Sequence, residues 1–168
     1  QPLYSPDRKQ VLAVNGEIYN HREIRTRYAG KYDFQTGSDC EVILALYKDK
    51  GIHFLEDISG IFAFVLYDEE KDEFLIARDP IGVIPLYIGR DKDGKIYFGS
   101  ELKALEGFCD EYELFLPGHY YYSKEGQMKR WYARDWTEYE TVKDNDAKAG
   151  DVKEALEDAV HRQLMSYV

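Results

Sequence analysis

An unbroken run of apolar and aromatic residues at positions 61–67 limits the folds that this chain can adopt. The run is far shorter than the roughly 20 residues of a membrane-spanning helix. A short apolar run that ends at charged residues is typical of a strand buried on both faces. We therefore expect a sheet with an apolar layer against each side.

Shorter apolar segments surround this run, with charged or turn-forming residues between them. Asn20 with Glu23 is a candidate cap for the first of two predicted helices. Ser38 with Glu41 forms a candidate capping box for the second helix, which Gly51 ends. Strands are predicted at 10–14, 74–77, 86–88, 96–99, 120–122 and 128–132. Helices followed by many antiparallel strands indicate an α+β layered domain.

The last part of the chain differs in composition from the rest. Residues 134–150 are acidic and poor in apolar side chains, as expected of a linker. Apolar residues then recur at helical spacing, so an amphipathic helix is predicted over 151–168. Because the chain begins at Gln1 and ends on this helix without a polar tail, we expect a piece cut at both ends.

Charge and cysteine content argue against several classes of function. The chain has 22 Lys and Arg against 32 Asp and Glu residues, a formal charge of −10, which argues against nucleic-acid binding. No segment resembles a signal peptide or a membrane span. The two cysteines, Cys40 and Cys109, suit neither a disulfide framework nor a metal site. We expect a cytoplasmic protein with no membrane partner and no metal of its own.

Asn15, Gly16 and Glu17 place an amide, a glycine N–H and a carboxylate at the end of the first predicted strand. An Asn amide beside a glycine N–H can form an oxyanion hole, and glycine lets a substrate approach the backbone. The plainer interpretation is a strand-to-helix turn, because Asn-Gly is a frequent turn dipeptide. The spacing alone favours the turn.

Asp39 and Cys40 open the second predicted helix, where a carboxylate lies near the positive end of the helix dipole. A plain helix cap is the alternative, and the spacing favours it. A cysteine in the first turn of a helix can become a nucleophile. Since no histidine lies close in sequence to act as its base, a packing role for Cys40 is favoured. Residues 78–87, taken alone, indicate only a turn between strands.

Six short segments, taken in order, carry a family resemblance. They are Asn-Gly-Glu-Ile-Tyr-Asn at 15–20, Thr-Gly-Ser-Asp-Cys-Glu at 36–41, Gly-Ile-Phe-Ala-Phe at 60–64, Arg-Asp-Pro-Ile-Gly-Val-Ile-Pro-Leu-Tyr at 78–87, Ser-Glu-Leu-Lys-Ala-Leu at 100–105 and Leu-Pro-Gly-His-Tyr at 116–120. The series resembles class II glutamine amidotransferase domains and, more narrowly, bacterial glutamine-hydrolysing asparagine synthetases. The resemblance covers essentially the whole chain, and the ordered set is more specific than any one segment.

The resemblance implies a fold, an activity and a set of partners. The fold would be the αββα sandwich of N-terminal-nucleophile hydrolases, and the activity hydrolysis of glutamine to glutamate and ammonia. Residues 1–133 would form part of the glutaminase domain, 134–150 a linker, and 151–168 the first helix of a synthetase domain. In that second domain ATP and magnesium would activate aspartate to receive the ammonia. The family commonly forms homodimers.

The resemblance also implies roles for individual residues. Asn15 and Gly16 would form the oxyanion hole, and with Glu17 and Asp39 they would bind glutamine. Ile61, Val83 and Ile84 would line the apolar start of an ammonia passage, where no wall group would supply a proton. The plainer interpretation of these three apolar residues is that they belong to the core.

The chain departs from the family pattern at its two ends. The nucleophilic cysteine and an arginine of the family would precede Gln1, and the nucleotide-binding loop would follow Val168. We therefore expect a sandwich without its first strands, which alone neither hydrolyses glutamine nor binds ATP. The alternatives are a catalytically dead structural domain of a related synthetase and a plain interaction module. The glutaminase interpretation requires Glu17 and Asp39 to lie on the same side of the molecule.

Overall fold

The protein folds into two antiparallel sheets with helices against one of them. The computed structural model describes residues 1–165 and, at position 135, only the backbone. The larger sheet has six strands in the order β1-β2-β3-β4-β8-β9. Their bounds are Leu3–Tyr4 (β1), Gln10–Ile18 (β2), Gly60–Asp68 (β3), Glu73–Arg78 (β4), His119–Tyr122 (β8) and Gln127–Arg130 (β9). The smaller sheet has the order β6-β5-β7, with bounds Tyr87–Arg90 (β5), Ile96–Gly99 (β6) and Glu111–Leu114 (β7).

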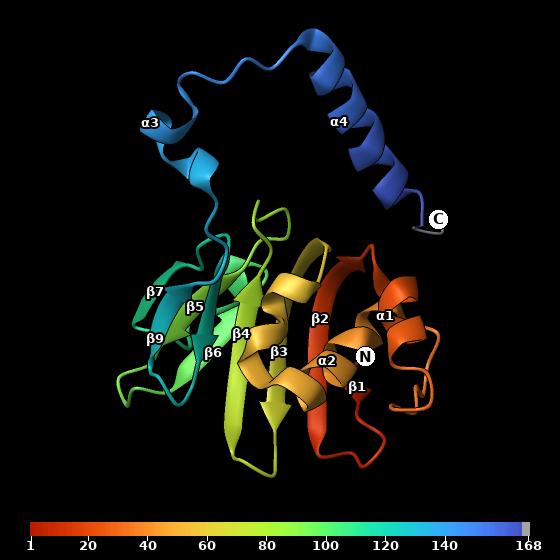
Figure 1. Ribbon diagram of the computed structural model, residues 1–168. Coiled ribbons are helices and arrows are strands. Elements are labelled where there is room, and N and C mark those ends of the chain that lie inside the picture. Colours follow the sequence, from red (N-terminus) through yellow and green to blue (C-terminus); the bar gives the residue numbers. More distant parts are fainter. Residues whose placement is uncertain (166–168) are drawn as a thin grey trace.

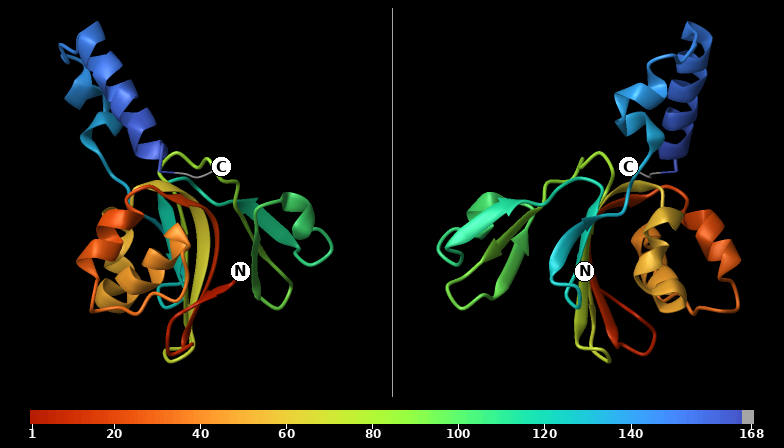
Figure 2. Two further views of the ribbon diagram at one scale, coloured as in Figure 1. Left: turned by 90° about the vertical axis from the view of Figure 1, so that its right-hand side faces the viewer. Right: turned by 60° about the vertical axis from the view of Figure 1, so that its left-hand side comes forward.

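The helices cover one face of the larger sheet, and the smaller sheet lies on the other side (Figures 1 and 2). The covering segments are α1 (His21–Arg27), the 3₁₀ turns η1 (Asp39–Glu41) and η2 (Gly51–Asp57), and α2 (Val42–Lys50). A third 3₁₀ turn, η3 (Leu102–Ala104), lies between β6 and β7 of the smaller sheet. The described residues thus form a helix–sheet–sheet arrangement, and the predicted α+β class is confirmed.

The central strand β3 packs on both faces, as the apolar run predicted, but its side towards the smaller sheet is less completely buried, with Tyr67 39% exposed. Phe62, Phe64 and Leu66 pack into the core between the larger sheet and the helices, and each is at most 1% exposed. Ala63, which alternates with them, belongs to the second core between the two sheets. Because side chains alternate along a strand, one run of residues supplies both cores.

The prediction that side-chain hydrogen bonds cap the two helices is wrong. The side chain of Asn20 makes no cap hydrogen bond; its amide instead donates to the carbonyl of Asp57 (2.8 Å) and accepts from the N–H of Ser59 (3.0 Å). Glu41 is fully buried and accepts from the main-chain N–H groups of Gln35 (2.5 Å) and Thr36 (2.7 Å). The main-chain N–H groups of these loops need partners, and the side chains of Asn20 and Glu41 supply them instead of capping the helices.

Several strand limits also differ from those predicted. The first strand continues to Ile18, and β5 begins at Tyr87 and extends to Arg90. The edge strands β1 and β7 carry too short an apolar pattern to have been predicted. Every residue of β7 is exposed, which explains the weak pattern.

The C-terminal part of the chain leads away from the sheets (Figure 1). The stretch 134–150 contains a 3₁₀ turn, η4 (Asp135–Thr137), and a short helix, α3 (Tyr139–Val142). Helix α4 (Ala149–Gln163) begins two residues before the predicted start, and all of its residues are exposed. The predicted helix residues 166–168 lie outside the described part. Within residues 1–165, no helix is long and apolar enough to cross a membrane.

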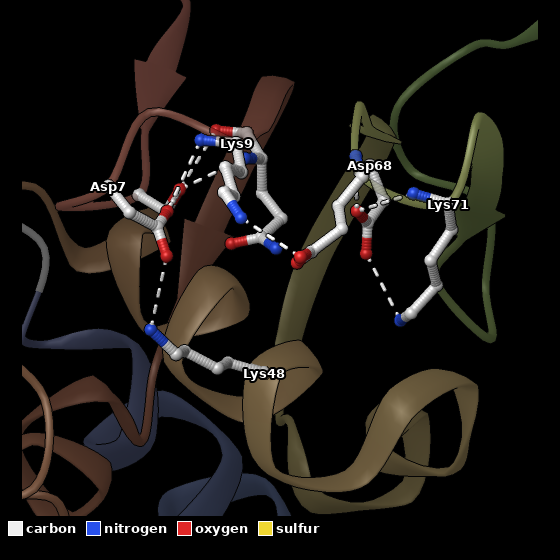
Figure 3. A network of polar contacts seen from close by, with 8 residues as sticks. Asp7, Lys9, Lys48, Asp68 and Lys71 are labelled. Atoms are coloured by element: carbon white, nitrogen blue, oxygen red, sulfur yellow. Dashed lines mark hydrogen bonds and ion pairs between the residues drawn. The ribbon is translucent and has the colours of Figure 1, made fainter.

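A polar network joins the ends of β2 and β3 that are remote from Asn15 (Figure 3). Asp7 accepts hydrogen bonds from the hydroxyl of Ser5 (2.6 Å) and the N–H of Lys9 (3.2 Å), and Lys48 of α2 lies 3.4 Å away. The hydrogen bond from Ser5, followed by that from Lys9, lowers the pKa of Asp7 from 3.8 to about 2. This carboxylate ties the β1–β2 turn to α2.

We predict that Asp7→Asn lowers thermal stability by a pH-dependent amount. A lowered folded-state pKa gives stability that is fully present above 3.8 and lost as pH falls through about 2. The loss should therefore be equal at pH 7 and pH 5, about 1 kcal/mol for a partly exposed charged hydrogen bond, and smaller at pH 3. Thermal unfolding of both proteins measures it. Asp144→Asn, at an exposed site in the C-terminal stretch, is the control and should show no such trend.

Candidate functional site

Three of the predicted site residues lie inside strand β2, so the predicted Asn15–Gly16 turn is wrong. Asn15, Gly16 and Glu17 pair with Ala63, Phe62 and Ile61 of β3 in an antiparallel register. Pairing with the central strand outweighs the local turn preference of the dipeptide. An extended backbone matters here because it alternates the direction of successive N–H groups.

Gly16 directs its main-chain groups away from β3. Its register partner Phe62 directs its main-chain groups away from β2. There the Phe62 N–H donates to the carboxylate of Asp79 (3.3 Å), and the Phe62 C=O accepts from the Asp79 N–H (2.8 Å). In an antiparallel ladder such a pair is not hydrogen-bonded to each other. The N–H of Gly16 therefore points out of the open edge of β2.

The neighbours of Gly16 on this edge behave in the same way, and their partners are side chains. The N–H of Val14 donates to the side-chain oxygen of Gln1 (2.9 Å), and the N–H of Ile18 donates to Oδ2 of Asp39 (2.6 Å). Side-chain groups thus satisfy the edge on both sides of Gly16. This alternation places an outward N–H donor of Gly16 between them.

Only glycine fits at position 16. Its φ of 143° lies in a region that other residues rarely adopt. A Cβ there would lie 2.1 Å from the carbonyl oxygen of Ile61 and 2.6 Å from the Cα of Phe62. The close approach of β2 and β3 at this point is therefore built on the absence of a side chain.

The acidic residues Glu17 and Asp39 both lie near enough to Cys40 for their charges to raise the pKa of its thiol; their joint role in binding glutamine stays a prediction. The thiol of Cys40 lies 3.7 Å from Oδ2 of Asp39 and 3.5 Å from the carbonyl of Gly16. Burial raises the pKa of Cys40 to about 12, and the charges of Asp39 and Glu17 contribute to the shift. Cys40 is thus a buried thiol in an acidic setting, which supports packing over reactivity.

Asn15 lines an open cleft between the two sheets. The cleft has a volume of about 310 Å³. Its walls are Gln1, Ala13, Val14, Asn15, Ala63, Phe64, Val65, Leu86, Phe98, Gly99 and Ser100. The wall is mainly apolar with a few polar groups, which is the usual character of a small-molecule site.

The three residues of the implied ammonia passage lie on two segments. Ile61 is a half-buried residue of β3. Ile84 packs against the second core, whereas Val83 is 52% exposed. Both segments are bound by Asp79, which accepts from the N–H groups of Phe62 and Val83. The structure brings these residues to one region, and their role remains a prediction.

Two residues of this region, Arg78 and Asp79, were not predicted from the sequence to have a role. Both are buried, with exposed fractions of 5% and 1%. Their side chains bind main-chain groups of the loop that follows β4. The available signal was a charged pair at the end of an apolar strand, directly before a Pro and Gly turn. Among the described residues no cluster of His, Cys, Asp and Glu is suited to a metal ion.

A family model and curated relatives match this chain. The model of the glutamine amidotransferase domain matches residues 1–132. The asparagine synthetase B [glutamine-hydrolyzing] of Escherichia coli (strain K12) is 53% identical over 168 residues, which is 100% of this chain and 30% of that protein. The asparagine synthetase [glutamine-hydrolyzing] of Sandersonia aurantiaca is 46% identical, over 100% of this chain and 32% of that protein. The chain thus spans about a third of the length of these relatives.

A solved structure has a similar fold. The glutamine phosphoribosylpyrophosphate amidotransferase from B. subtilis, complexed with ADP and GMP, matches with a TM-score of 0.66 and 29% sequence identity. The match covers 80% of this chain and 32% of that chain. The α+β fold is therefore similar to that of this amidotransferase.

We predict that Gly16→Ala destabilises the fold by about 3 kcal/mol, because the new Cβ overlaps the backbone of β3. Urea unfolding followed by circular dichroism measures the loss. Gly30→Ala is the matched control: Gly30 also has a positive φ, of 74°, but its Cβ would meet nothing within 4 Å. That change should cost only about 1 kcal/mol of backbone strain. Equal losses at the two positions would contradict the close approach at Gly16.

Proposed function

The chain belongs to the glutamine amidotransferase domain family, in the form that asparagine synthetases carry, and from this premise we propose that it is the glutaminase portion of such an enzyme. Glutamine would be hydrolysed to glutamate and ammonia, and the ammonia would amidate aspartate. One observation supports the proposal: Asp39 and Cys40 contact the open edge of β2 around Gly16, next to a cleft that Asn15 lines.

The two donors fit the chemistry of amide hydrolysis. Attack on the glutamine amide carbon turns its carbonyl oxygen into an oxyanion. The Gly16 N–H points out of the strand edge, and Asn15 lines the adjacent cleft, so the two can donate to one oxygen. Because the Gly16 donor is part of a strand paired along its full length with β3, it needs little reorganisation during the reaction.

The two carboxylates fit the other end of the substrate. The α-ammonium of a free amino acid is attracted to Glu17 and Asp39 together. The N–H of Ile18 donates to Oδ2 of Asp39 and fixes the direction of this carboxylate. The amino acid head group would thus be held on the same strand end that carries the oxyanion donors.

The nucleophile is proposed to come from outside these 168 residues. Burial raises the pKa of Cys40 to about 12, and burial also raises the pKa of Cys109, on the far side of the smaller sheet. Neither thiol supplies a thiolate near neutral pH. We therefore propose that this chain binds and orients glutamine but does not hydrolyse it alone.

The remaining parts of the enzyme are proposed from the same premise. The helix–sheet–sheet arrangement would be a partial αββα sandwich of the N-terminal-nucleophile type, with 134–150 as the linker. Helix α4 exposes Val152, Leu156 and Val160 at helical spacing, which fits a helix that packs into a synthetase domain. In that domain ATP with magnesium would activate aspartate.

We predict that Asp39→Asn in the full-length protein raises the KM for glutamine roughly 10- to 100-fold. Losing one of two charges that hold an ammonium group costs about 1.4 to 3 kcal/mol. Synthesis from added ammonia should be unchanged, because it does not use this site. Steady-state assays with each nitrogen source test this.

The control for this experiment is Asp33→Asn, at an exposed residue of the preceding loop. It should leave both assays unchanged. Unaltered glutamine kinetics in Asp39→Asn would refute the proposed role of Asp39. A parallel loss of both activities would show that Asp39 acts on the fold as a whole.

A further inference from the structure

Arg78 is a buried arginine whose hydrogen bonds go to main-chain carbonyls. Its Nε donates to the C=O of Ile84 (2.7 Å) and its Nη2 to the C=O of Gly82 (2.7 Å). Its Nη1 donates at 2.6 Å to the C=O of Phe115, which directly follows β7. One guanidinium therefore joins the loop after β4 to the chain segment that returns to the larger sheet.

Asp79 makes the complementary contacts to main-chain N–H groups. Its carboxylate accepts from Ile81 (2.9 Å), Gly82 (2.6 Å) and Val83 (3.1 Å), all in the loop after β4. The same carboxylate accepts from the N–H of Phe62 in β3 at 3.3 Å. A single side chain thus fixes the loop to the central strand.

The residue of β3 that Asp79 contacts, Phe62, is the direct neighbour of Gly16, the proposed oxyanion donor. Gly16 is the register partner of Phe62, and a Cβ on Gly16 would lie 2.6 Å from the Phe62 Cα. The charge of Asp79 also acts on Tyr19. Burial is the largest cause of the raised pKa of Tyr19, and the charges of Glu17 and Asp79 raise it further. Together, Arg78 and Asp79 therefore contact the strand that supports Gly16 and the loop that carries Val83 and Ile84.

We propose that Arg78 and Asp79 are positioning residues that couple the two steps: they hold the loop carrying Val83 and Ile84 against the strand that supports Gly16. Ammonia released at the Gly16 end thereby meets the apolar side chains of a loop that is held in one place. The inference rests on the proposed function and deepens it. Neither residue is proposed to touch the substrate.

The physical reason lies in how the buried charges are satisfied. A buried guanidinium or carboxylate is tolerated only when its hydrogen-bonding groups find partners. Here the partners are loop carbonyls and N–H groups, so the loop conformation and the buried charges require each other. Lysine at position 78 carries all its donors on one nitrogen, so it cannot reach the three carbonyls that Nε, Nη1 and Nη2 of Arg78 contact. Asparagine at position 79 places N–H donors against N–H donors.

The experiment uses the full-length protein with Asp79→Asn and, separately, Arg78→Lys. The measured quantity is glutamate formed per asparagine formed, with the rate of ammonia-dependent synthesis measured beside it. Complete transfer gives a ratio of one in the unaltered protein. We expect the ratio to rise about threefold or more in each variant, because small displacements at such sites have large kinetic effects. The ammonia-dependent rate should be unchanged.

A further variant covers the case in which these changes prevent folding. Gly82→Ala keeps both charges, but its Cβ would lie 3.0 Å from Cζ of Arg78 and 2.6 Å from Cγ of Pro117. The same rise in the ratio is expected. An unchanged ratio in the folded variants would overturn the inference.

The matched control is Asp91→Asn, which alters another loop-holding carboxylate. Asp91 accepts from the N–H groups of Asp93 (2.9 Å) and Lys95 (2.8 Å) in the β5–β6 connection. Its ratio should stay at one, and a rise there would mean general loosening and would overturn the inference. Asp39→Asn separates the two proposals: if it spares glutamine use, the proposed glutamine site, with its role for Asp39, fails. If it behaves as predicted while the ratio stays at one, only the coupling role fails.

Discussion

The packing of β3 on both faces is the constraint on which the rest of the structure depends. Phe62, Phe64 and Leu66 require a helical layer on one side, and Ala63 requires the smaller sheet on the other. A strand in that position must also have both edges paired, here by β2 and β4. The layers, the strand order and the place where the two sheets open into a cleft all follow from this one strand.

The geometry of the candidate site follows from the pairing of β2 with this strand. An antiparallel ladder sends alternate N–H groups to opposite edges, so the register alone decides that Gly16 faces outward. A shift of one residue would turn its N–H towards β3 and present Asn15 on the wrong face. The missing Cβ of Gly16 lets the two strands approach in this register. The donor is thus fixed by long-range pairing rather than by a local turn.

The sequence predicted those features that depend on apolar periodicity. The central strand, most of the other strands and the second helix came from their patterns, and the ordered motifs indicated the family. It could not predict the partners of individual polar groups. Asn20, Glu41 and the Asn15–Gly16 pair each have a common local use, and in each case the main chain of another segment is the partner instead. Local preferences are worth about 1 kcal/mol, less than an unsatisfied buried N–H costs.

The polar groups of the molecule divide into two kinds by their partners. At the remote ends of β2 and β3, Asp7, Lys9 and Lys48 form exposed contacts that salt and water weaken. Near the site, Glu41 and Asp79 are buried and accept from main-chain N–H groups, so they fix loop conformations instead of stabilising a surface. Breaking such a contact leaves a buried charge unpaired, which costs more free energy than an exposed ion pair contributes. Buried carboxylates of this kind therefore mark the loops whose conformation is fixed near the candidate site.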